Sequence, residues 1–166
     1  MNSIALLYFP LFMALAATSD LLTMKISNRL VLALVAGFLV LALVINLPLQ
    51  QFMMHIAAGL VVLAVAFSFF AFGWVGGGDA KLAAATSLWL GFGMTLPYLV
   101  YAALMGGALT LGLLLLRRYP LPGMLAKVAW VDRLHDKKTG IPYGIALAAA
   151  GLVTYADTTI FQLLIQ

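Results

Sequence analysis

Cysteine and glutamate are absent from this chain of 166 residues, and charged residues of any kind are scarce. Without cysteine the chain has no disulfide, thiol nucleophile or thiolate metal ligand, and the two separated histidines, His55 and His135, cannot form a histidine-rich metal site. Charged residues make up 8% of the sequence, against roughly a quarter in a soluble domain. With 65% hydrophobic residues and a mean hydropathy of +1.13, the composition excludes an ordinary soluble fold.

Long uncharged stretches predict membrane-spanning helices, each of about 20 residues. The run 82–116 would be about 52 Å long as one straight helix, so we divide it at the turn that Gly91, Gly93 and Pro97 indicate. The predicted fold class is therefore all-α, a polytopic membrane protein with the single domain 1–166 and six transmembrane helices. The predicted spans are 3–19, 30–47, 55–75, 80–93, 97–116 and 141–165.

The basic residues indicate how these spans are oriented. All nine Lys and Arg fall in the first, third and fifth loops, so the positive-inside rule places those loops in the cytoplasm and both termini outside. Their role is topological, and we expect membrane lipid but no nucleic acid as a partner. In the fifth loop, apolar residues at three-to-four spacing predict a short amphipathic helix at the membrane interface: Met124, Leu125, Val128, Val131 and Leu134.

Two of the five aspartates lie where an apolar span meets the cytoplasmic side, Asp20 after the first span and Asp79 before the fourth. Ionisable groups at membrane depth are costly and usually functional. Two carboxylates that converge in a partly dehydrated pocket share one proton. One can then take a proton from an attacking water while the other donates to the oxyanion. This aspartyl chemistry needs no metal or cofactor, and we expect none.

The residues around Asp79 suggest how a substrate could reach it. Gly76, Gly77 and Gly78 leave the backbone without side-chain cover, so an extended peptide could approach closely. The alternative is that Asp79 merely caps the N-terminus of the fourth helix, an ordinary use of aspartate.

Three segments resemble those of one known family, the type IV prepilin peptidases of the GxGD class of aspartyl proteases. Its GxGDxK motif is matched by Gly76-Gly77-Gly78-Asp79-Ala80-Lys81. The region after its first catalytic Asp resembles Asp20 followed by Lys25-Ile26-Ser27-Asn28-Arg29, with Ser27 in place of the usual proline. Its PYG(I/V)A segment is similar to Ile141-Pro142-Tyr143-Gly144-Ile145-Ala146.

This resemblance implies a bacterial inner-membrane endopeptidase that removes the short basic leader of a prepilin or pseudopilin on the cytoplasmic side. It implies that Asp20 and Asp79 are the catalytic pair. Substrate contacts are then expected from Gly76, Gly77, Gly78, Lys81, Lys25, Asn28, Pro142, Tyr143 and Gly144. Lys25 and Lys81 have an alternative role as topological anchors. The chain resembles the short, peptidase-only form associated with tight-adherence (Flp) pili, for which no methyltransferase activity is expected.

Three other functions fit some of these features. A different GxGD protease would act on preflagellin or signal peptides. A small proton-coupled transporter would also use intramembrane carboxylates, but it predicts an inverted internal repeat, which the sequence does not contain. In a structural membrane subunit, both aspartates would serve only as helix caps.

Overall fold

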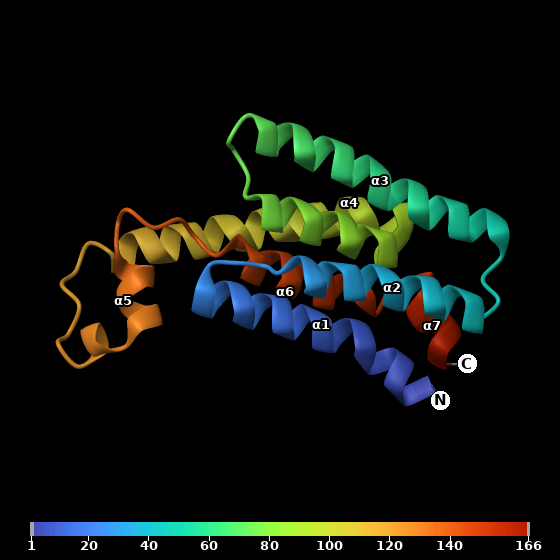
Figure 1. Cartoon of the computed structure of the whole chain (residues 1–166), viewed down its shortest axis with the longest axis horizontal. Coiled ribbons are helices and arrows are strands. Elements are labelled where there is room, and N and C mark those ends of the chain that lie inside the picture. The colour runs from blue at the N-terminus through green and yellow to red at the C-terminus, as the bar shows by residue number, and fades with distance from the viewer. Residues whose placement is uncertain (1, 166) are drawn as a thin grey trace.

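The computed structural model describes residues 2–165, and within that range the chain contains helices and no strands. Successive helical segments run back and forth along the long axis of an elongated bundle (Figure 1). The start of α1 and α7 lie at one end of the bundle, while the α1–α2 connection, the α3–α4 connection and α5 lie at the other (Figure 1). The elements are α1 (Asn2–Thr23), α2 (Asn28–Val44), α3 (Leu49–Ala71), α4 (Gly77–Leu116), a 3₁₀ turn η1 (Leu125–Lys127), α5 (Ala129–His135), α6 (Tyr143–Tyr155) and α7 (Thr159–Ile165).

The long element α4 is folded back on itself at Gly91. This glycine has a φ of 68° and a ψ of 175°, a conformation that interrupts the helix and that other residues rarely adopt. Ala83 and Ala103 line the same cleft, although in a straight helix they would be about 30 Å apart. The reversal lies within the turn predicted at residues 91–97 but is tighter than expected, because Pro97 is already inside the second half of the helix.

The predicted spans differ from the helices in their bounds. By length and composition, α1, α3 and α4 are able to cross a membrane, and α6 with α7 makes a fourth span if that pair is counted as one. The number of six spans and the outward placement of the termini stay predictions. The predicted last span is interrupted, since α6 and α7 meet at 53°. Thr158 accounts for the interruption, because its Oγ1 accepts a hydrogen bond from the amide of Phe161 (3.1 Å) and so begins a new helix.

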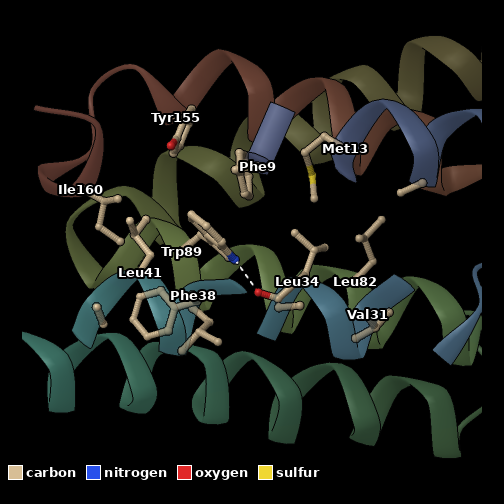
Figure 2. Packing of buried hydrophobic residues seen from close by; sticks show 14 of the residues in the cluster. Phe9, Met13, Val31, Leu34, Phe38, Leu41, Leu82, Trp89, Tyr155 and Ile160 are labelled. Atoms are coloured by element: carbon tan, nitrogen blue, oxygen red, sulfur yellow. Dashed lines mark hydrogen bonds between the residues drawn. The ribbon is translucent and has the colours of Figure 1, made fainter. Parts of the chain in front are cut away.

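Trp89 lies at the centre of the apolar core, fully buried in the first half of α4. Its indole Nε1 donates a 2.9 Å hydrogen bond to the carbonyl of Leu34 in α2 (Figure 2). The rings of Phe9 (5.4 Å between centroids) and Phe38 (6.0 Å) pack against it from α1 and α2. A buried indole needs such a partner for its N–H, so Trp89 fixes the height of α4 relative to α2.

A buried arginine ties the polar loop to the bundle at the opposite end from the termini. Arg117 is only 6% exposed, and its guanidinium donates to the carbonyls of Leu134 (2.9 Å), Thr139 (3.2 Å) and Gly140 (3.0 Å). The interfacial helix predicted in this loop is shorter than the apolar spacing suggested, because the chain is extended at Val128, between η1 and α5.

Candidate active site

Three segments far apart in the sequence meet at the loop end of the bundle. Asp20 lies in the last turn of α1, inside the helix rather than after it, because α1 continues to Thr23. Asp79 lies in the first turn of α4, and Gly144 in the first turn of α6. Gly144 touches Asp20, and Ile26 lies against both Gly144 and Gly78, the residue before Asp79, so the two aspartates belong to one junction.

The chain after Asp20 is shaped by two local features. Met24 adopts a φ of 55°, which ends α1 and turns the chain. Ser27 then caps α2, since its Oγ accepts a hydrogen bond from the amide of Leu30 (3.2 Å). A proline at this position has no side-chain acceptor, so the serine that departs from the family pattern supplies a cap of its own.

Asp20 is almost completely buried, with 5% of its surface exposed. Its Oδ2 accepts a 2.7 Å hydrogen bond from the amide of Gly144. The amides in the first turn of a helix have no partner within that helix, and the N-cap residue of α6, Pro142, offers no side-chain cap. A carboxylate is favoured at this end of a helix dipole, so Asp20 caps α6 from α1.

Gly144 leaves no space for a side chain. A Cβ at this position would lie 2.8 Å from Oδ2 of Asp20, 2.9 Å from its Cβ, and 2.8 Å from Cδ1 of Ile26. The backbone of α6 therefore approaches Asp20 more closely than any other residue type would allow.

Asp79 has a different environment from Asp20. It is half-buried and lines a cleft. Gly76, not Asp79, is the N-cap residue of α4. Within residues 2–165, no group donates a hydrogen bond to the Asp79 carboxylate. The alternative role of Asp79 as the cap of this helix is therefore wrong, and its carboxylate is free to act on something in the cleft.

Two further contacts join the segments that carry the aspartates. Ile26 lies against Gly144 and also against Gly78, where a Cβ would be 3.3 Å from that of Ile26. Lys81 donates a 3.1 Å hydrogen bond from Nζ to Oδ1 of Asn28, which links the N-termini of α4 and α2. The site is thus a packed junction of α1, α2, α4 and α6.

The cleft next to Asp79 has a volume of about 680 Å³ and lies between α3, both halves of α4 and α6. Aliphatic and aromatic side chains line nearly all of it. Tyr143 borders it from α6, with its hydroxyl hydrogen-bonded to Oγ1 of Thr110 (2.9 Å). The cleft therefore presents an apolar surface that leads to one carboxylate.

Most of the predicted site residues are brought together in this region. They are Asp20, Asp79, Gly76, Gly77, Gly78, Lys81, Asn28, Pro142, Tyr143 and Gly144. Lys25 differs, because its hydrogen bonds in the described structure are made by its main chain: its carbonyl accepts from Ser19 (2.8 Å) and Thr23 (3.3 Å).

Sequence reasoning did not single out Ile26, Thr110 or Arg117 as parts of this region. Thr110 carries no recognisable signal, since a threonine in an apolar run is common, and Ile26 stands out only as one member of the segment 25–29 that resembles the family. Arg117 did carry a sequence signal, because it is the first charged residue after the long apolar run 82–116.

A multi-pass helical bundle with two aspartates brought together at the ends of its helices has the architecture of a membrane-embedded aspartic hydrolase. The sequence model of the type IV leader peptidase family matches residues 7–111, more than half of the chain and the part that holds both aspartates. The chain belongs to this family, and it is a prepilin leader peptidase, an aspartic-type hydrolase. The segment 141–146 lies outside the matched residues. Searches of curated proteins and of solved structures gave no match.

Proposed function

We propose that the chain removes the short basic leader of a type IV prepilin or pseudopilin of the Flp type, with Asp20 and Asp79 as the catalytic pair. The observation that carries this proposal is the placement of the two carboxylates. One is held by the amide of Gly144, and the other is unpaired and faces an apolar cleft. Family membership favours this hydrolase over the transporter and the structural subunit.

The chemistry follows from the different environments of the two carboxyl groups. Asp20 accepts a hydrogen bond at a helix N-terminus, which favours its charged form, so it takes the proton of the attacking water. Asp79 carries the shared proton and donates it to the oxygen of the scissile carbonyl. When the tetrahedral intermediate collapses, the C–N bond breaks, the amine takes the proton from Asp20, and Asp79 regains its own.

The distribution of charge supports a cytoplasmic site in the bacterial inner membrane. All nine Lys and Arg lie in segments near the loop end of the bundle, where the aspartates are, and none lies near the end with the termini (Figure 1). The positive-inside rule assigns such an end to the cytoplasm. A prepilin leader lies there as well, because its basic residues stay outside the bilayer while the apolar segment enters it.

The first test is co-expression with an Flp-type prepilin, followed by measurement of leader removal on a gel. We expect cleavage by the wild type and loss of cleavage in Asp20→Asn and Asp79→Asn, because asparagine keeps the size of the side chain but cannot exchange the proton. Asp157→Asn is the matched control, since Asp157 is exposed between α6 and α7 at the opposite end of the bundle. Cleavage by both site variants, at equal abundance in the membrane, would refute the aspartyl pair.

Substrate class needs a second comparison. The same strain is supplied with an Flp-type prepilin, a preflagellin or a signal peptide, each with an epitope tag at its C-terminus. The proposal expects cleavage of the prepilin alone, and faster cleavage of either other substrate would reassign the enzyme within the GxGD class.

A further inference from the structure

The cleft beside Asp79 is longer than a peptide bond requires. Residues that line it on the second half of α4 run from Phe92 to Ala103, a rise of about 16 Å or three helical turns. On α3 its lining runs from Val61 to Phe69, about 12 Å. The cleft therefore follows the direction of the helices from Asp79 towards the Gly91 turn.

Small residues form the floor of the cleft. Ala80, Ala83 and Ala102 are buried at its base, from the two halves of α4. Helices in membranes associate closely where small residues let their backbones approach. The rim, in contrast, carries large exposed side chains such as Phe69 and Leu96. This arrangement of a small floor and a bulky rim fits an inserted helix better than it fits a flat surface.

Charge identifies which part of a substrate belongs in the cleft. Asp79 is the one charged residue in the lining that the structure describes, and it lies at one end. Moving the charged side chains of a basic leader from water into an apolar cleft would cost a large free energy, so the leader does not bind there. The segment on the other side of the scissile bond is apolar, and it continues directly from Asp79 into the cleft.

We propose that the cleft between α3, the two halves of α4 and α6 binds the apolar segment of the substrate as a helix of about three turns, which positions the scissile bond at Asp79. This inference rests on the proposed leader peptidase function. It adds that the enzyme recognises the membrane segment that stays with the product as well as the leader that is removed.

A matched pair of substitutions tests the cleft. Ala103 and Ala108 are both exposed on the second half of α4, but only Ala103 lines the cleft. Two substrates are compared, a full prepilin in the membrane and a soluble peptide that ends four residues after the scissile bond. Because added methylenes oppose close packing, Ala103→Leu lowers the ratio of prepilin cleavage to peptide cleavage about tenfold or more. Ala108→Leu keeps the wild-type ratio.

Cysteine crosslinking gives a second, independent measurement. The chain contains no cysteine, so single cysteines report without background. In an Asp79→Asn enzyme, Ala103→Cys is expected to form disulfides with substrate cysteines placed every three or four residues along the apolar segment, the period of one helical face. Ala108→Cys is expected to form none.

The outcomes separate this inference from the proposed function. A wild-type enzyme that cleaves neither substrate would refute the function itself. Cleavage by the wild type together with an unchanged ratio in Ala103→Leu, or equal crosslinking from both cysteines, would overturn the cleft inference alone and leave the cleft to lipid. Crosslinks at alternate substrate positions would refute the helical form and indicate an extended strand.

Discussion

Gly144→Ala is the substitution that separates the position of Asp20 from its chemistry. The variant keeps both aspartates and adds one methyl group at the start of α6. That methyl would lie 2.8 Å from Oδ2 of Asp20 and 2.8 Å from Cδ1 of Ile26, distances that side-chain carbon atoms do not tolerate. Either the carboxylate moves or α6 moves, and in both cases the 2.7 Å hydrogen bond from the amide of Gly144 is strained.

The expected loss is large for activity and moderate for stability. Overpacking of a buried site costs about 1–3 kcal/mol, which a folded membrane bundle can absorb. A catalytic group displaced by about 1 Å loses about 10²-fold in rate. We therefore expect Gly144→Ala to cleave a prepilin about 100-fold more slowly than the wild type, with the enzyme still folded.

The assay is a time course of leader removal with purified enzyme in detergent, together with a thermal unfolding curve of the same samples. Gly107→Ala is the control, because a Cβ added there would meet no neighbouring part of the bundle within 4 Å and alanine favours a helix over glycine. It should cleave at the wild-type rate. Wild-type activity in Gly144→Ala would show that the close approach of α6 does not position Asp20.

Three further predictions address the turn, the core and the lysines. Gly91→Ala destabilises the protein by about 2 kcal/mol, because a residue with a side chain is strained at a φ of 68°. The control Gly93→Ala leaves the unfolding temperature unchanged, because a Cβ added there would meet nothing within 4 Å. Equal unfolding temperatures for the two variants would show that the turn does not require a glycine at position 91. Trp89→Phe leaves a buried carbonyl without its indole partner and costs about 1–3 kcal/mol, so an unaltered unfolding curve would refute its role. Lys81→Ala slows leader removal more than Lys25→Ala does, since only Lys81 forms a side-chain bond across the site; the reverse order would assign Lys81 to topology.

The apolar runs made the helical fold predictable, because in lipid every backbone polar group must be satisfied within the segment. The reversal of α4 could also be predicted, since a glycine-rich turn was needed in a run too long for one span. The interruption between α6 and α7 could not be inferred from hydropathy, which is continuous there. A threonine that caps a helix, Thr158, is a local signal that the apolar pattern concealed.

The site was predictable as a list of residues but not as a geometry. The motif around Asp79 is local, so the sequence places its glycines and its carboxylate together. The contact of Asp20 with Gly144 joins residues 124 positions apart, and no spacing within one segment indicates it. The role of Arg117 has the same origin, because its acceptors are main-chain carbonyls that any sequence supplies.

The early reversal of α4 has a consequence for the bilayer itself. From Gly77 to Gly91 the first half of this helix rises only about 21 Å, against a hydrocarbon core of about 30 Å. Lipid thins to match only a short hydrophobic segment that it touches, and residues 82–91 are all buried inside the bundle. The neighbours that expose large apolar side chains, α3 and the second half of α4, rise about 33 Å and about 36 Å. The mismatch is therefore taken up inside the protein, and the bilayer around the bundle keeps its ordinary thickness.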